Sequence, residues 1–172
     1  MRKSPRGFSL IELLIVVAII LIIAAIAIPN LLRSRIAANQ ASAVGSLRTL
    51  NTAEVTYSVT YNTGYTATLG DLGPPATAAN PVATAAGLID SVLAGSGGSA
   101  GATAMTSSKS GYIFTYSTPG TDASGRIDTY SITATPVTVA TTGTNFYYTD
   151  QSGVIRQNST AVAGSTDSPL AG

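Results

Sequence analysis

One carboxylate interrupts the most apolar stretch of the sequence. Glu12 lies within residues 8–28, where every other side chain except that of Ser9 is apolar. A carboxylate in a membrane-spanning helix costs on the order of 2.5–3.5 kcal/mol on insertion scales, so its position is a functional-site candidate by default. A buried charge also needs a partner. Glu12 is therefore the first candidate functional residue of this chain.

The residue types of common catalytic sites are scarce. The chain has no His and no Cys, which removes the most common general base, thiolate nucleophiles and disulfides. Asp, Glu, Ser and Lys could still build an enzyme, but no motif brings them together. A net charge of +1, without a basic cluster beyond the first six residues, argues against dedicated nucleic-acid binding. The sequence predicts a non-enzyme with no cofactor, metal or small-molecule substrate.

The segment that positions Glu12 is long enough to cross a membrane. A helix over residues 8–28 would measure about 31 Å. Three basic residues in the first six positions predict a cytoplasmic N-terminus, although Arg33 and Arg35 on the far side weaken that asymmetry. A secretory signal peptide is an alternative, because residues 25–27 form an A-x-A pattern. A cut there would place Pro29 beside the scissile bond, and neither a signal peptide nor a plain anchor explains Glu12.

Residues 7–14, Gly-Phe-Ser-Leu-Ile-Glu-Leu-Leu, follow a short basic leader and begin the apolar segment. This arrangement resembles the N-terminus of type IV prepilins and type II secretion pseudopilins, and the resemblance covers about residues 1–50. It implies that a prepilin peptidase cuts after Gly7 and that the new terminal Phe8 is N-methylated. Pro29 lies where such pilins commonly carry a helix-kinking proline, and proline does bend or open a helix.

The implied cut has a chemical consequence for Glu12. Loss of residues 1–7 would change the net side-chain charge from +1 to −2 and would give Phe8 a terminal ammonium. In a filament of packed helices, Glu12 of one subunit could pair with the Phe8 amine of a neighbour. That pairing would set the axial register, as a polar residue does in a coiled coil.

Beyond the apolar segment, residues 29–61 have helical periodicity. We expect an amphipathic continuation of the helix whose outer half packs on a head domain. The apolar positions of this pattern are Leu32, Ile36, Ala43, Leu47, Leu50 and Tyr57, whereas Arg33, Arg35, Asn39, Gln40, Arg48 and Glu54 occupy other positions. Tyr57, Tyr61 and Tyr65 fall four residues apart, and we interpret them as packing residues rather than as an aromatic ladder. Asn62-Thr63-Gly64 predicts the end of the helix.

The middle of the chain, residues 62–110, is predicted to be a connecting loop rich in Ala, Gly, Ser and Thr. Within it, residues 88–93 form a short apolar turn that we expect to dock on the head. Residues 111–172 are predicted to form an antiparallel sheet of three or four strands and a C-terminal tail. Strands are expected at residues 111–116 and 128–134, and a hairpin at residues 145–156.

Two weak signals remain in the C-terminal half. Asp122, Asp128 and Asp150 lack the spacing of a calcium loop, so turn capping is the favoured interpretation. Asn158-Ser159-Thr160 matches an N-glycosylation acceptor.

The predicted fold is α+β, with one long N-terminal helix, half transmembrane and half amphipathic, packed on a small antiparallel sheet. The resemblance implies a type IV pilus subunit that forms a homo-oligomeric filament. Its partners would be the prepilin peptidase and the pilus assembly platform with its ATPase. The precursor would reside in the inner membrane and the filament at the cell surface. A type II secretion pseudopilin, forming a periplasmic piston, is an alternative, and an anchored or secreted binding protein is a remote one.

Overall fold

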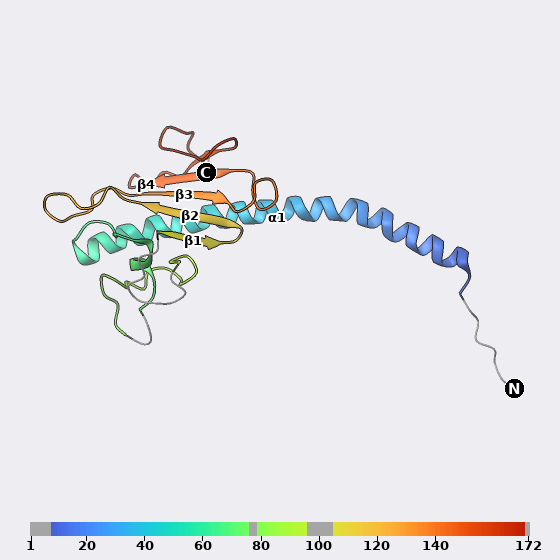
Figure 1. Ribbon diagram of the computed structural model, residues 1–172, viewed down its shortest axis with the longest axis horizontal. Helices are drawn as coiled ribbons and strands as arrows, with labels where there is room; N and C mark the ends of the chain where they lie inside the picture. The colour runs from blue at the N-terminus through green and yellow to red at the C-terminus, as the bar shows by residue number, and fades with distance from the viewer. Residues whose placement is uncertain (1–7, 76–78, 96–104, 171–172) are drawn as a thin grey trace. The chain divides into compact units, whose positions relative to one another are not determined.

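A computed structural model describes residues 8–75, 79–95 and 105–170. The chain divides into two compact units, residues 1–35 and residues 36–172, and each is described by itself. One helix, α1, spans Leu10–Tyr61 and supplies residues to both units (Figure 1).

In the first unit, the described residues are almost entirely helix α1. Its large apolar side chains are exposed, from Phe8 at 84% to Val17 at 46%. The helix is long and apolar enough to cross a membrane. Pro29 lies inside α1, with helical residues on both sides, and the kink expected there stays a prediction.

The second unit contains a five-stranded antiparallel sheet in which each strand pairs with the next one along the chain (Figure 1). The connections from β1 to β2 and from β4 to β5 are short, whereas longer segments join β2 to β3 and β3 to β4. Its strands are β1 (Thr106–Lys109), β2 (Tyr112–Ser117), β3 (Ser131–Pro136), β4 (Phe146–Asp150) and β5 (Arg156–Asn158). A short 3-10 helix, η1, covers Leu69–Leu72.

The core lies between one face of the sheet and the part of α1 that belongs to this unit. Alternate β2 side chains point inward, because successive residues of a strand face opposite sides. Tyr112, Phe114 and Tyr116 are therefore buried together with Leu47 and Leu50 of α1.

Polar side chains of α1 form hydrogen bonds with the sheet and with the segments that connect its strands. The Asn51 amide nitrogen donates to the Thr149 hydroxyl at 2.8 Å, and the Tyr130 hydroxyl donates to the Asn51 amide oxygen at 3.1 Å. The Asn39 amide nitrogen donates to the Thr142 carbonyl at 2.9 Å. The expected α+β architecture, one long helix and an antiparallel sheet, is confirmed.

The strands differ from the prediction in number and in some of their boundaries. There are five, because β1 lies inside the segment 62–110 that was expected to be a loop. The strand expected at 128 begins at Ser131 instead, since Ile127 is occupied by a bridge to Gly64 and Asp128 by an ion pair with Arg126. β2 and β4 lie within one residue of their predicted positions, whereas β5 begins at Arg156, where the predicted hairpin ended.

The segment 62–110 contributes more to the core than its composition suggested. Leu69 and Leu72 of η1 are fully buried, and Ile89 and Leu93 are buried in the turn expected to dock on the head. Backbone N–H groups of Leu88 and Ile89 donate to the Leu72 carbonyl. A few large side chains, placed among many small ones, are enough to attach this segment to the head.

The three spaced tyrosines are packing residues, as we interpreted them. Tyr57 and Tyr61 lie in contact at the end of α1, with ring centroids 4.8 Å apart. After Tyr61 the chain turns with positive φ at Asn62 and Gly64, and Tyr65 then packs edge-on against Tyr130 at 4.7 Å. The helix therefore ends where the Asn-Thr-Gly signal predicted.

Candidate assembly site

The first turn of α1 holds the candidate assembly residues. Phe8 is highly exposed, and Glu12 is exposed four residues further on. The Ser9 backbone N–H donates to the Glu12 carboxylate Oε2 at 2.9 Å. Gly7, the other residue of the expected cleavage site, lies outside the described residues.

The bond between Ser9 and Glu12 is half of a capping box. In this motif an acidic residue three positions after the N-cap accepts the N-cap backbone N–H, which is otherwise unsatisfied. The carboxylate also lies at the positive end of the helix dipole. This local role was not predicted, although Ser9-x-x-Glu12 has the spacing of the motif. Glu12 thus helps to begin the helix whatever else it does.

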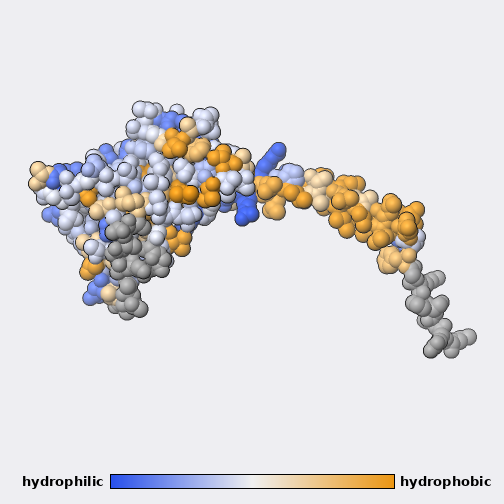
Figure 2. Space-filling model, viewed as in Figure 1, coloured by the Kyte–Doolittle hydropathy of each residue, from blue (hydrophilic) through white to orange (hydrophobic). Residues whose placement is uncertain are grey.

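The surface around Glu12 is apolar on all sides of the helix. Figure 2 shows the side chains of this part of α1 as a nearly continuous hydrophobic surface. The exposed side chains near Glu12 include those of Leu10, Ile11, Leu13, Leu14 and Ile15. A helix that is hydrophobic all round is buried in a membrane or among other apolar helices. The first unit therefore offers a large apolar surface that carries one carboxylate.

The environment of Glu54 differs from the prediction. Glu54 was grouped with the polar positions of α1, but it is 0% exposed in the second unit. The signal was available, because Leu47, Leu50, Glu54 and Tyr57 follow the three- and four-residue spacing of one helical face. Desolvation by burial raises the pKa of Glu54 above its ordinary value, although hydrogen bonds from Thr66 oppose that shift.

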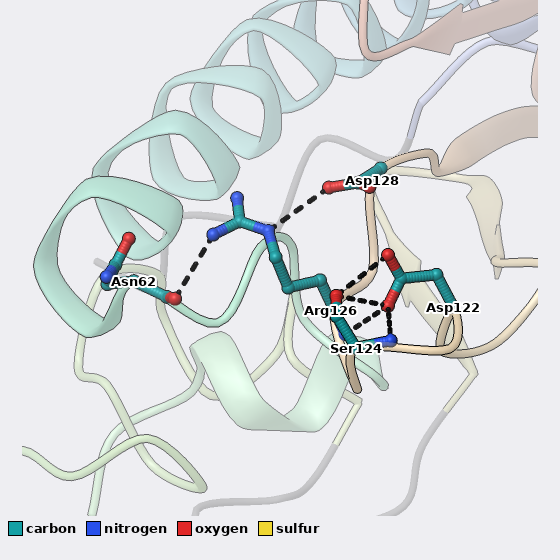
Figure 3. Close-up of polar contacts among 5 residues, drawn as sticks. All are labelled: Asn62, Asp122, Ser124, Arg126 and Asp128. Atoms are coloured by element: carbon teal, nitrogen blue, oxygen red, sulfur yellow. Dashed lines mark hydrogen bonds and ion pairs between the residues drawn. The ribbon is translucent and has the colours of Figure 1, made fainter.

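Of the three carboxylates considered for calcium, two cap turns and one pairs with an arginine instead. As Figure 3 shows, Asp122 Oδ1 accepts hydrogen bonds from the backbone N–H groups of Ser124 and Arg126, at 2.8 and 2.9 Å, and from the Ser124 hydroxyl. The bond from the Ser124 hydroxyl is the main reason that the pKa of Asp122 is lowered. The Arg126 guanidinium also contacts Asp128 at 3.4 Å and the Asn62 carbonyl at 3.3 Å. Within the ranges that the structure describes, no three acidic side chains gather as metal ligands.

The glycosylation signal falls on an amide that is already engaged. The Asn158 amide nitrogen donates to the Asp167 carboxylate at 3.0 Å. Its oxygen accepts from the Thr160 backbone N–H at 2.9 Å and from the Ala161 N–H at 3.2 Å. Asn158 therefore organises the turn before the C-terminal tail.

Together, the site and the fold define a class of protein. The chain combines a capped apolar N-terminal helix that carries a carboxylate with an α+β, pilin-like architecture. Residues 2–28 match the family model for the prokaryotic N-terminal methylation motif. The resemblance drawn from residues 7–14 is thereby confirmed, and the N-terminal region carries this motif.

Two proteins of known type are similar to the chain. Over 58 residues it is 52% identical to the type IV major pilin protein PilA of Myxococcus xanthus, a match that covers 33% of this chain and 26% of that protein. Over 80 residues it is 42% identical to the type IV wide pilus major component PilA4 of Thermus thermophilus, covering 45% of this chain and 61% of that protein. The chain thus spans about a quarter and three fifths of the lengths of these relatives. No solved structure matches it.

Proposed function

We propose that this chain is a structural subunit of a type IV pilus, polymerised through the apolar helix of residues 8–28. The observation that carries the proposal is the exposed apolar surface of α1, which bears the single carboxylate of Glu12 within an N-terminal methylation motif. Similarity to two type IV major pilin components supports it. The chain would act by assembly and not as an enzyme.

The geometry at Glu12 suggests how subunits would be aligned. Its Oε2 accepts the Ser9 N–H, while Oε1 accepts no hydrogen bond among the described residues. After a cut behind Gly7, Phe8 would carry an ammonium. Glu12 Oε1 of one subunit would then accept a hydrogen bond from the Phe8 ammonium of its neighbour. Because an unpaired charge between apolar helices is costly, only the register that makes this pair would be stable.

The same proposal assigns partners and locations. A prepilin peptidase would cleave between Gly7 and Phe8 and methylate Phe8. The assembly platform and its ATPase would then extract the subunit from the inner membrane. Before assembly the apolar helix would lie in the bilayer, with the N-terminus in the cytoplasm. After assembly the helix would be covered by its neighbours in the filament.

The mature N-terminus tests processing directly. Intact-mass and peptide mass spectrometry of the membrane-bound protein should find a chain that begins at methylated Phe8. A chain that begins at Met1 or at Ile28 would contradict the proposal, since it would indicate an unprocessed anchor or a signal-peptidase product.

The fate of the processed subunit distinguishes a pilus from a secretion pseudopilus. Antibodies against the second unit should label long filaments outside the cell in electron micrographs. Label confined to the periplasm would favour the pseudopilin alternative. The major-pilin relatives favour the surface filament, and we propose that outcome.

A further inference from the structure

A buried polar cluster in the second unit has no place in the assembly scheme above. It is built around Glu54, whose carboxyl group is fully buried beneath the sheet. Glu54 Oε2 accepts the Thr66 backbone N–H at 3.0 Å, and Oε1 lies 2.6 Å from the Thr66 hydroxyl. The Tyr116 hydroxyl donates to the Thr66 carbonyl at 2.8 Å and lies 3.2 Å from the Thr66 hydroxyl.

These three residues come from three different segments. Glu54 lies on α1, Thr66 on the connection that follows α1, and Tyr116 on β2. All three are among the fully buried side chains of the unit. The cluster therefore holds the end of α1, the connecting segment and strand β2 together.

The surroundings of Glu54 provide no positive charge. Among the described residues, the ion pairs join Lys109 to Asp90 and Arg126 to Asp128, and neither involves Glu54. The titratable groups that act on Glu54 from the elements around it are all acids. They are Asp71 from η1, Tyr57 from α1, Tyr116 from β2 and Tyr130 from the segment before β3. A buried carboxylate without a cation is strongly disfavoured relative to the neutral acid.

When Glu54 is neutral, each hydroxyl proton of the cluster has its own acceptor. A proton on Oε1 would be donated to the Thr66 hydroxyl, which would donate its own proton to the Tyr116 hydroxyl. The Tyr116 hydroxyl already donates to the Thr66 carbonyl. Loss of the Glu54 proton would turn the Thr66 hydroxyl back to Oε1, so that the contact between Thr66 and Tyr116 would have no proton to share.

We propose that Glu54, Thr66 and Tyr116 form a proton-dependent latch, closed while Glu54 carries its proton and weakened when the proton is lost. Closing the latch fixes the last turns of α1 to the connecting segment and to β2. The raised pKa of Glu54 supports this assignment. The latch adds a response to pH that lies in the second unit and does not depend on whether the first unit polymerises.

The sign of the response follows from the direction of the pKa shift. A carboxyl group whose pKa is higher in the folded than in the unfolded state contributes full stability below its unfolded pKa. That contribution is lost as the pH rises through the folded pKa. The second unit should therefore lose the contribution of the latch on the alkaline side.

The protonation of Glu54 can be measured directly by NMR. Glu12 and Glu54 are its only glutamates, so labelling Glu with ¹³C at the side-chain carboxyl carbon gives two signals. In the full chain in detergent micelles, Glu12→Gln removes one signal and assigns the other to Glu54. We expect the Glu54 signal to titrate well above the ordinary Glu pKa of about 4.3. Titration at or below that value would overturn the proposal.

Thermal unfolding tests the consequence for stability. All eight tyrosines lie in the second unit, so the tyrosine near-ultraviolet circular dichroism of the full chain reports on that unit. Glu54→Gln keeps the hydrogen-bonding pattern of the neutral acid, because its amide oxygen can accept the Thr66 N–H and its NH₂ can donate to the Thr66 hydroxyl. We expect its Tm to match the wild type at pH 4 and to exceed it by about 4 °C at pH 8.

Thr66→Val is the matched comparison, since it removes the hydroxyl while keeping the backbone N–H and the approximate shape. It should lower Tm in both protonation states. It should also raise further the pH at which the Glu54 signal titrates, because the Thr66 hydroxyl no longer donates a hydrogen bond to the carboxylate. A difference between wild type and Glu54→Gln that stays constant from pH 4 to pH 8 would overturn the latch. If Glu54→Gln did not fold, the carboxyl titration of the wild-type chain would decide alone.

Discussion

Glu12 and Glu54 lie on the same helix, yet Glu12 is exposed and Glu54 is fully buried. Near Glu12 the apolar side chains of α1 are exposed on all sides, and the carboxylate is exposed with them. Near Glu54 the apolar side chains are covered by the sheet, and the carboxyl group is buried with hydrogen-bonding contacts to Thr66 of its own unit. Glu54 has its hydrogen-bonding partners within its own unit, whereas Glu12 accepts only the Ser9 N–H among the residues that the structure describes.

A carboxyl group in apolar surroundings can therefore have either of two roles. A buried acid can be kept neutral by neighbours that share its proton, and it then strengthens one fold. An exposed acid on an apolar helix keeps its capacity to bind a cation brought by another molecule. The difference lies in which surfaces cover the helix, and it can be tested with variants matched between the two units.

The largest expected effect is that of Glu12→Gln on filaments. Glutamine can still accept the Ser9 N–H, so the helix start should persist, but it cannot neutralise the Phe8 ammonium of a neighbour. Loss of a buried ion pair at about 3–5 kcal/mol predicts a fall in assembled subunits on the order of 100-fold or more. The amount of sheared filament, measured by immunoblot against processed membrane-bound subunit, checks this.

If Glu12→Gln formed normal filaments, the proposed pairing with the Phe8 ammonium would be wrong, and capping of the helix would be the remaining role of Glu12. The control is Glu54→Gln, which should leave processing and assembly intact. A loss of filaments in the control variant would mean that the two glutamates are not independent.

The next prediction concerns the change in stability caused by Leu→Ala at a buried and at an exposed position of α1. Leu47→Ala should destabilise the second unit by about 2–5 kcal/mol, because Leu47 is fully buried and its removal leaves a cavity. Leu21→Ala, in the first unit, should leave the stability of the second unit unchanged, since Leu21 is 63% exposed. Urea unfolding followed by tyrosine circular dichroism in micelles measures both, and equal losses would contradict the division into units.

Gly64 and Gly45 are expected to respond in opposite ways to substitution by alanine. Gly64 has φ +85, and a Cβ there would lie 2.3 Å from the Ile127 carbonyl oxygen. Gly64→Ala should therefore cost about 1–3 kcal/mol from backbone strain, and more from the clash. Gly45 lies inside α1 with open space around it, so Gly45→Ala should stabilise the unit by up to about 1 kcal/mol. The same unfolding assay should give shifts of opposite sign.

The smallest effect concerns an exposed acid whose pH response is opposite to that of Glu54. Partial burial raises the pKa of Asp90, but hydrogen bonds from Lys109 at 2.7 Å and from the Leu93 and Val92 N–H groups lower it by more. Its contribution is therefore present above the unfolded pKa and is lost as the pH falls through the folded pKa. Lys109→Ala should cost about 0.2–1 kcal/mol at neutral pH and nothing once Asp90 is protonated in strong acid. A cost that grew on acidification would contradict this sign.

Local patterns predicted the elements well where one signal dominated. Uniform apolarity placed the first part of α1, Asn62 and Gly64 ended it, and alternation placed β2. The prediction failed where contacts between distant segments decided the outcome. β1 has a Thr-Ser-Ser-Lys sequence with no strand signal of its own, and it forms because Ser107 and Lys109 pair with Phe114 and Tyr112. Glu54 was misplaced because residue type was given more weight than helical spacing.

The covalent sequence alone was sufficient for the features that depend on neighbouring residues. These include the methylation motif, the apolar helix that bears Glu12, the end of that helix and the turn-capping role of Asp122. The tertiary structure decided the environment of Glu54, because burial depends on which side chains of β2 and of the connecting segment converge on it. A carboxyl group has no fixed role of its own, and the dielectric and hydrogen bonds around it decide whether it stays neutral in a core or carries a charge to a partner.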